Sequence, residues 1–433
     1  MKIVIINKSD STGGAAVVSR RLMEALRGEG VDARMLVAER LTDSPYIALA
    51  ASPRAIKHSF MAERLKIFLA NGLNRSTLFK IDTASDGLSL WNHPWVKGAD
   101  AILLNWVNQG MLSLSGIDRL LRLGKPVVWT MHDMWCLTGI CHHAGECGGF
   151  RMECGCCPLL GKRGRPDDIS HTTLLKKQTL NSRPEKIRYV AVSNWLARKA
   201  AESTLLRDAD IEVIPNPFLL SDAPAVEPAE SPLPEKDDHT VRILFGAARL
   251  DDTVKNLPAL IAMTRSLNER DPELARHLEL ITFGNVKDPA ALEGIAIPHR
   301  HLGMVRGEEK IRDIYSKGDI VVSSSTYETL PGTLVEAQAY GCIPVSFDQG
   351  GQSDIVDHLH TGYIAPFSPD PEEGGRRLAE GVRWAADIIS RPDTRQEIID
   401  PMRANVENRF SAKRVAEMYI DLIRRTRHHS SGA

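Results

Sequence analysis

The sequence predicts an α/β protein built from two doubly wound, Rossmann-like domains that face each other across a cleft. Short apolar runs alternate with amphipathic stretches along the chain, which is typical of parallel sheets covered by helices on both faces. A stretch rich in Pro and acidic residues, 221–240, interrupts this alternation. The 433 residues, 43% of them apolar, are enough for two separate cores.

The first domain is expected over residues 1–220. It opens with a β-branched run at Lys2–Ile6, followed by a glycine-containing loop and apolar positions at helical spacing. Further buried strands are predicted at 33–37, 101–104, 126–130, 189–192 and 212–214.

Residues 221–240 read as a linker, because their composition cannot bury enough apolar surface to form a core. The alternation then restarts in a second domain, 241–410. Its strands are predicted at 242–245, 278–283, 319–323 and 344–347, and its helices at 256–265, 308–317 and 333–340. Residues 411–433 are expected to form a closing helix and tail.

Charge and hydropathy exclude several classes of function. The net charge of −1 and the pI near 6.9 disfavour nucleic acid as a partner. The N-terminal apolar run is too short for a signal peptide, and no run approaches the roughly 18 apolar residues of a membrane span. We therefore expect a cytoplasmic protein.

Residues 54–80 contain six Lys or Arg against one acid, with apolar residues near one helical face. The commoner explanation is an ordinary packed helix with a solvated face. The alternative is a basic amphipathic surface that makes a peripheral contact with anionic lipid, at the inner face of the plasma membrane.

Two acids eight residues apart, Glu328 and Glu336, flank a helix start. Pro331 and Gly332 disfavour a helix between them, so Glu328 is expected on a loop and Glu336 in the first turns of the following helix. The N-terminus of such a helix is a natural seat for an anion such as a nucleotide diphosphate. Two carboxylates beside it could hold sugar hydroxyls.

Other polar residues follow predicted strands, where the ligand crevice of such sheets lies. They are Gly13-Gly14 after the opening strand, His132-Asp133 after 126–130, Arg249 and Lys255 after 242–245, and Gly350-Gly351 with Asp354 after 344–347. Each also has a non-functional explanation, as a solvated charge, a turn glycine or a structural histidine.

In this order the motifs resemble the retaining nucleotide-sugar glycosyltransferases of family four, which have the GT-B fold, and the resemblance covers essentially the whole chain. It implies that Arg249 and Lys255 bind the donor diphosphate, that Glu336 binds the ribose, and that Glu328 faces the transferred sugar. Backbone groups of Leu334, Val335, Gly350 and Gly351 would contact phosphate. Asn256 and Asp354 depart from the family's usual Gly and Glu.

On the first domain, the same resemblance assigns His132 to a hydrogen bond with the donor sugar. Asp133 would be its neighbour or an acceptor-side group, and Gly13 and Gly14 would lie near the donor phosphates and the acceptor. The family retains the anomeric configuration, either by front-side attack within an ion pair or by double displacement through a carboxylate.

The resemblance also implies that catalysis needs no metal, because fixed cations and helix dipoles meet the leaving diphosphate. The only Asp-x-Asp pair, Asp208 and Asp210, lies in a polar loop of the first domain. We interpret these two residues as solvated loop acids.

Six of the seven cysteines lie between Cys136 and Cys157. Four of them, Cys141, Cys147, Cys154 and Cys157, have a spacing at which thiolates can converge on one tetrahedral ion. The segment 132–160 resembles a subgroup of family four associated with colanic acid and other exopolysaccharides. A structural Zn site is one hypothesis; buried free thiols and redox disulfides are the alternatives.

The predicted activity is transfer of a hexosyl group from a nucleotide-diphosphate sugar to a growing, lipid-linked exopolysaccharide or lipopolysaccharide glycan, with no catalytic cofactor. A nucleotide-sugar 2-epimerase and a non-catalytic glycan-binding subunit of the same fold are the alternatives.

Overall fold

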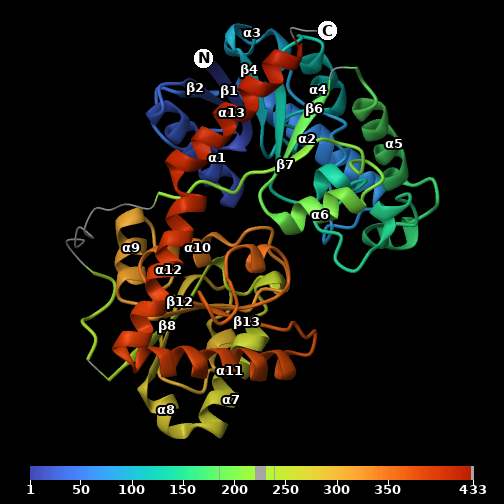
Figure 1. The fold of residues 1–433 in the computed structure, drawn as a ribbon. Coiled ribbons are helices and arrows are strands. Elements are labelled where there is room, and N and C mark those ends of the chain that lie inside the picture. The colour runs from blue at the N-terminus through green and yellow to red at the C-terminus, as the bar shows by residue number, and fades with distance from the viewer. Residues whose placement is uncertain (185, 220–230, 238, 431–433) are drawn as a thin grey trace. The chain divides into compact units, whose positions relative to one another are not determined.

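The computed structural model describes residues 1–184, 186–219, 231–237 and 239–430. Most of the predicted linker, 221–230 and residue 238, and the end of the predicted tail, 431–433, fall outside the described residues. The chain divides into two compact units (Figure 1). The first contains Met1–Pro217 and Ala412–Ala433, and the second contains Phe218–Ser411.

The first unit has a seven-stranded sheet in which the assigned pairs are parallel. Its strand order is β3-β2-β1-β4-β5-β6-β7, so the progression reverses between β1 and β4. The strands are β1 (Lys2–Ser9), β2 (Asp32–Glu39), β3 (Ile47–Leu49), β4 (Ala101–Leu104), β5 (Val127–Met131), β6 (Ile187–Ala191) and β7 (Ile211–Val213).

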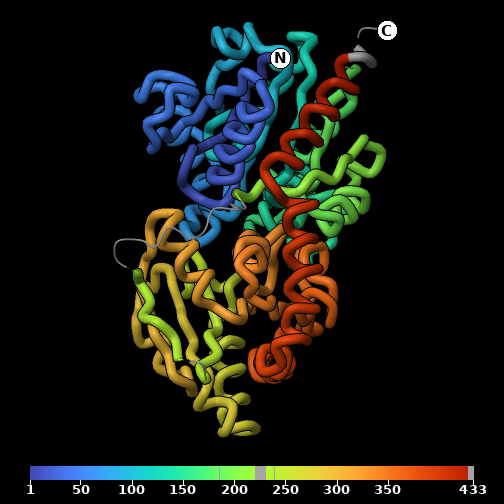
Figure 2. The backbone as a smooth tube through the Cα atoms, turned by 60° about the vertical axis from the view of Figure 1, so that its left-hand side comes forward, coloured from blue at the N-terminus to red at the C-terminus, as the bar shows by residue number. Residues whose placement is uncertain are grey.

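Helices cover this sheet, and the C-terminal helix is one of them. They are α1 (Gly14–Gly28), α2 (Pro53–Ala70), α3 (Pro94–Gly98), α4 (Leu114–Leu121), α5 (Ile169–Asn181), α6 (Asn194–Glu202) and α13 (Ala412–Ser430). Helices α1 and α13 share one core with inward residues of β1 and β2, through side chains such as Leu22 and Ile423. Tyr419 of α13 hydrogen-bonds Thr130 of β5 at 2.8 Å. Figure 2 shows α13, in red, running along the first unit.

The second unit repeats the architecture with six strands in the order β10-β9-β8-β11-β12-β13. They are β8 (Val241–Arg249), β9 (Leu278–Asn285), β10 (His299–His301), β11 (Ile320–Ser323), β12 (Ile343–Phe347) and β13 (Tyr363–Ala365). The helices are α7 (Leu257–Arg270), α8 (Pro272–His277), α9 (Glu308–Ser316), α10 (Gly332–Ala339), α11 (Pro371–Ile389) and α12 (Pro392–Phe410).

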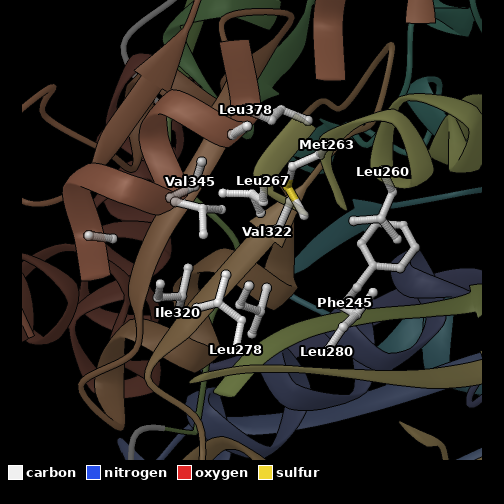
Figure 3. Close-up of a cluster of buried hydrophobic side chains, with 14 of the residues drawn as sticks. Phe245, Leu260, Met263, Leu267, Leu278, Leu280, Ile320, Val322, Val345 and Leu378 are labelled. Atoms are coloured by element: carbon white, nitrogen blue, oxygen red, sulfur yellow. The ribbon is translucent and has the colours of Figure 1, made fainter. Parts of the chain in front are cut away.

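The core of the second unit lies between its sheet and helices α7 and α11 (Figure 3). Phe245 and Val322 from the sheet meet Leu260 and Met263 of α7 and Leu378 of α11. The two helices approach closely because Gly375 has no side chain: a Cβ there would lie 2.5 Å from that of Ala262. The α/β fold predicted from alternating strands and helices is confirmed. Strands β3, β10 and β13, with three residues each, were not predicted, although the equally short β7 was.

The polar starts of several helices explain where they begin. Ser52 caps α2 by accepting the N–H of Ala55, and Asp168 caps α5 by accepting those of Ser170 and His171. Within the described ranges, no helix combines the length and the apolar character needed to cross a membrane.

Candidate functional site

In sheets of this type, ligands bind beyond the carboxyl ends of the strands, where the strand order reverses. The reversal lies between β1 and β4 in the first unit and between β8 and β11 in the second. Each unit therefore has one expected binding edge, and most of the predicted site residues lie on loops at these two edges.

In the second unit, the predicted cation Lys255 and the predicted acid Glu328 form an ion pair. The Lys255 Nζ lies 2.5 Å from Glu328 Oε1, which also accepts a hydrogen bond from Ser325 Oγ at 2.9 Å. The Ser324 hydroxyl donates to the backbone oxygen of Lys255 at 2.7 Å and so fixes its turn. Neither member of the pair is fully enclosed, with 29% and 19% of their side chains exposed, so a ligand can compete for both.

The predicted glycine pair lies beside Glu328. Gly350 has φ of 133°, and a Cβ there would lie only 1.9 Å from the backbone oxygen of Glu328. Glycine is required both by this backbone conformation and by this close approach. The Gly351 N–H donates to the same oxygen at 2.8 Å. The Gly351 N–H, which the resemblance assigns to a phosphate contact, therefore already donates a hydrogen bond within the protein.

A buried glutamine next to this pair has unmet hydrogen-bonding capacity. Gln352 is fully buried, and neither Oε1 nor Nε2 makes a hydrogen bond within the described chain. Its Oε1 lies 2.9 Å from the position that a Cβ on Gly350 would take. A buried amide without partners costs stability, so Gln352 is a candidate for contact with a polar ligand. No pattern in the sequence marks this residue.

The remaining predicted residues of the second unit are more dispersed. Arg249 ends β8, is 45% exposed and pairs with Asp251 at 3.1 Å. Glu336 lies in α10, as predicted, and its Oε2 accepts a hydrogen bond from the Tyr315 hydroxyl at 3.4 Å. Asp354 ends the short 3-10 turn Gly351–Asp354 and is half-buried.

Leu334 and Val335 have completely buried side chains in the first turns of α10. The Leu334 N–H donates to the backbone oxygen of Pro331 at 3.2 Å. The first N–H groups of a helix are the ones that have no intrahelical acceptor. In α10 these belong to Gly332 and Thr333, which are therefore better placed than Leu334 and Val335 for an anion.

In the first unit, a cavity of about 810 Å³ lies at the carboxyl ends of β1 and β2. Gly13 and Gly14 line it at the start of α1, where Gly13 has φ of 90°. Lys8 contributes an ammonium that donates to Gln109 O at 3.0 Å. Burial lowers the pKa of Lys8 below its ordinary value. Apolar residues of α2 form the opposite wall, so the cavity combines cations, backbone amides and apolar surface.

His132 follows β5, at the same edge of the sheet. Its Nε2 lies 3.0 Å from Asn105 Oδ1 and therefore carries the proton, since an amide oxygen only accepts. Burial lowers the pKa of His132 to about 4, although Asp133 opposes this change, so the ring is neutral near pH 7. The Asn105 Nδ2 is buried and makes no hydrogen bond within the described residues.

Asp133, the neighbour of His132, is held by several hydrogen bonds. Its carboxylate accepts hydrogen bonds from the Trp135 N–H and the Trp106 indole, each at 2.8 Å, and contacts His142 Nδ1 at 2.7 Å. Burial opposes its ionisation, yet His142 and the backbone hold the pKa of Asp133 below its usual range. These three contacts hold Trp106, Trp135 and His142 around the carboxylate.

His142 connects Asp133 to a second buried carboxylate, and the sequence analysis missed this connection. Its Nε2 lies 2.7 Å from Asp82 Oδ2, and Asp82 pairs with the Arg64 guanidinium. Burial alone would lower the pKa of His142, but the two carboxylates raise it to about 10. Glu63, beside Arg64, has a pKa raised to about 7 by burial and by Asp82. These five residues form a buried chain of charges, which we call the charge chain.

A second cavity, of about 830 Å³, lies at the opposite edge of the same sheet, where β5 and β6 begin. Asp208 and Asp210 line it, and Asp210 pairs with Arg188. The edge at the amino ends of the strands is not where ligands of this fold bind. Despite its similar volume, we therefore give this cavity no functional role.

The four cysteines of the predicted metal site line one small cavity of about 30 Å³. The Gly139 N–H donates to Cys154 Sγ at 3.3 Å. Burial raises the pKa of Cys141 to about 12 and that of Cys157 to about 11, so both are thiols. Among the residues the structure covers, no three His, Cys, Asp or Glu side chains are gathered closely enough to hold an ion. Four cysteine sulfurs are ligands that suit zinc, but they would have to move closer together to bind one ion.

Comparison with known proteins finds a family match within the second unit. Residues 231–388 match the family described as glycosyl transferases group 1. The colanic acid biosynthesis glycosyl transferase WcaC of Escherichia coli K12 is 21% identical over 438 residues, covering 97% of this chain and 99% of that protein.

Two solved structures are similar over almost their full length. Sucrose-phosphate synthase from Thermosynechococcus elongatus has a TM-score of 0.61 at 16% identity, covering 99% of this chain and 100% of that one. Anabaena HepE in complex with UDP has a TM-score of 0.57 at 14% identity, covering 98% and 99%. Residues 231–388 therefore form a glycosyl transferases group 1 domain, and the chain as a whole has the GT-B fold.

Proposed function

We propose that this protein transfers a hexosyl group from a nucleotide-diphosphate sugar to a growing, lipid-linked exopolysaccharide or lipopolysaccharide glycan, with retention of the anomeric configuration. The observation that carries the donor assignment is the group formed by Lys255, Glu328 and Gly350 at the strand-order reversal of the second unit. The colanic acid relative and the UDP-bound neighbour support the glycan and the nucleotide respectively.

In this proposal the diphosphate takes the Lys255 ammonium away from Glu328. The exposed Arg249 exchanges its partner Asp251 for a phosphate oxygen, and the N-terminus of α10 adds backbone N–H groups. Glu328, released from Lys255, then accepts hydrogen bonds from the sugar. Because cations and a helix dipole meet the charge of the leaving group, no divalent ion is required.

The acceptor glycan is assigned to the 810 Å³ cavity of the first unit, which has cationic, amide and apolar walls. The Nδ1 of neutral His132 can accept a hydrogen bond at the reacting sugar, and the unsatisfied Asn105 amide offers a donor. A lipid-linked acceptor implies work at the cytoplasmic face of a membrane.

The cysteine cavity is proposed to hold a structural zinc ion that ties the segment between β5 and α5. Binding requires loss of the thiol protons, which the ion itself favours. Metal analysis of the purified protein should find about one zinc per chain. Absence of zinc, with all thiols alkylated readily under native conditions, would leave buried free thiols as the explanation.

The donor assignment is tested by titrating UDP, GDP and their sugars into the protein by calorimetry. Lys255→Ala and Arg249→Ala should each weaken binding about 10- to 100-fold, which is the scale of a charge-assisted hydrogen bond. Lys310→Ala, which removes an exposed cation of α9 outside this group, is the matched control. Unchanged affinity and turnover in both site variants would refute the assignment.

Product analysis separates the proposed transfer from its competitor, the 2-epimerase reaction. Transferase activity gives a glycosylated acceptor and a nucleoside diphosphate, whereas an epimerase isomerises the donor without an acceptor. A non-catalytic glycan-binding subunit would do neither. Turnover should be the same with and without added Mg²⁺ or Mn²⁺.

A further inference from the structure

Helix α2 of the first unit, labelled in Figure 1, buries mainly polar side chains and leaves large apolar ones exposed. Its buried positions are Ser59, Glu63, Arg64 and Ile67, three of them polar or charged. Its outward positions carry large apolar side chains. The common explanation of this segment, a packed apolar face with a solvated polar face, is therefore wrong for α2.

The inward face is fixed by specific contacts. The Ser59 hydroxyl donates to Gly110 O at 2.7 Å, and Glu63 accepts the N–H groups of Gly110 and Ala84. A Cβ on Gly110 would lie 2.7 Å from the Phe60 nitrogen, so helix and loop meet closely. Because Arg64 pairs with buried Asp82, the helix cannot turn its apolar side inward without leaving these charges unpaired.

The exposed apolar side chains form a continuous ridge. Met61, Leu65 and Leu69 recur every four residues and are 54%, 56% and 60% exposed, and Leu73 follows the helix at 58%. Side chains four apart lie on one helical face. Eight of the twelve large exposed apolar residues of the described chain fall within 41–79. Such a concentration marks an interaction surface.

Exposed cations surround this apolar ridge. Of the six Lys or Arg in 53–80, all but Arg64 are exposed, and the only acid in this range, Glu63, is buried. The exposed ones are Arg54, Lys57, Lys66, Arg75 and Lys80. Lys66 pairs with Asp86 at 2.8 Å, and the segment as a whole presents a positive surface.

From the apolar ridge and its cations we infer that α2 is a docking surface for an anionic lipid bilayer. A two-fold contact with a second copy of the chain would place the same cations opposite one another, which disfavours that occupant. A bilayer matches both features, because acyl chains accept the ridge and anionic headgroups accept the cations.

This inference deepens the proposed function. The first turns of α2 also line the 810 Å³ cavity, through Pro53, Ile56, Lys57 and Phe60. A helix lying on the membrane would therefore bring this cavity to the level of the headgroups. A sugar carried on a membrane lipid could reach it there without leaving the bilayer.

The test is co-sedimentation of the full chain with phosphatidylglycerol vesicles and with neutral phosphatidylcholine vesicles. Each cation at an anionic surface raises binding about fivefold, so phosphatidylglycerol should be strongly preferred. Binding should weaken in 1 M salt, where the screening length is about 3 Å. The double variant Leu65→Gln/Leu69→Gln should reduce binding at least about tenfold.

The matched control is Leu175→Gln/Met304→Gln, which alters exposed apolar residues elsewhere and should bind like the wild type. A gain-of-signal variant, Leu69→Trp, should shift its emission to the blue with phosphatidylglycerol vesicles, and Leu175→Trp should not. In the Leu65/Leu69 variant, the affinity for the nucleotide sugar, measured by calorimetry, and the rate of transfer to a water-soluble acceptor should equal those of the wild type. A failure of membrane binding can therefore be distinguished from a failure of the proposed transfer.

Three results would overturn the inference. One is a wild type that fails to bind phosphatidylglycerol vesicles. Another is a Leu65/Leu69 variant that binds them as tightly as the wild type. The third is a wild-type dimer that the same variant converts to monomers, because the ridge would then be covered by a second copy.

Discussion

The charge chain of the first unit makes its stability depend on pH, and His142 dominates this dependence. The pKa of His142 is raised to about 10 in the folded protein, above its ordinary value of 6.5. The folded state therefore holds a proton that the unfolded state releases. The stabilisation is complete below pH 6.5 and is lost as the pH rises through 10.

The size of this stabilisation follows from the difference between the folded and unfolded pKa values of His142. Each pH unit between the two pKa values is worth about 1.4 kcal/mol, so His142 contributes at most about 5 kcal/mol. The lowered pKa of Asp133 reflects the same attraction to His142, so its free energy is not counted a second time. Glu63, whose pKa is raised from 4.5 to about 7, acts in the same direction: its stabilisation is complete below pH 4.5 and is lost as the pH rises through 7.

The assay is urea unfolding at pH 6, 8 and 9.5, followed by tryptophan fluorescence. Six of the seven tryptophans lie in the first unit, so the signal reports mainly on it. The free energy of unfolding should fall steadily across this range. In His142→Gln the fall should largely disappear, and stability at pH 7 should drop by about 3–5 kcal/mol because the buried carboxylates Asp82 and Asp133 lose the cation that they share.

His143→Gln is the control, because His143 is the adjacent histidine and is exposed. It should behave like the wild type at every pH. The reasoning is refuted if wild-type stability is constant or rises between pH 6.5 and 10, or if His142→Gln shows the same slope as the wild type.

Three further predictions concern single residues near the two binding edges. Gly350→Ala should lower the stability of the second unit by about 3 kcal/mol in thermal unfolding, since its Cβ would meet Glu328 O at 1.9 Å; Gly303→Ala, at positive φ in open space, should cost about 1 kcal/mol, and equal costs would contradict the clash. Gln352→Leu should leave the stability of the free protein unchanged or raise it by about 1 kcal/mol, while calorimetry shows about tenfold weaker donor binding; unchanged affinity would exclude a contact between Gln352 and the donor. His132→Gln should lower kcat without changing the shape of the pH profile between pH 5 and 8, because the pKa of His132 is about 4; loss of a titration step in that range would show that His132 changes charge during turnover.

Much of the candidate site in the second unit could be predicted from local sequence. Glu328, Gly350 and Lys255 lie far apart in the chain, but each follows a strand of one parallel sheet, and parallel strands bring such loops to one edge. Turn chemistry placed Glu328 outside a helix and Glu336 inside one, as the structure has them. The individual amides could not be assigned in this way, because the bonds of Leu334 and Gly351 depend on local backbone geometry.

The charge chain could not be predicted. His142 directly follows Cys141 in the cysteine-rich segment, and Glu63 and Arg64 read as the solvated face of a basic helix. Their partners, Asp82 and Asp133, come from two other segments. Periodicity shows which residues share a face of α2, but it does not show which face turns inward when the buried surroundings are themselves charged.

The sequence by itself determined the α/β class, the two parallel sheets and the loops that carry polar residues, because strand and helix periods and turn residues act over a few neighbours. Tertiary structure decided which of these residues meet: the Lys255 and Glu328 pair, the unsatisfied Gln352 and the reversed orientation of α2. Those outcomes depend on pairing between distant charges and on burial. Both are properties of the folded chain as a whole rather than of any short segment of it.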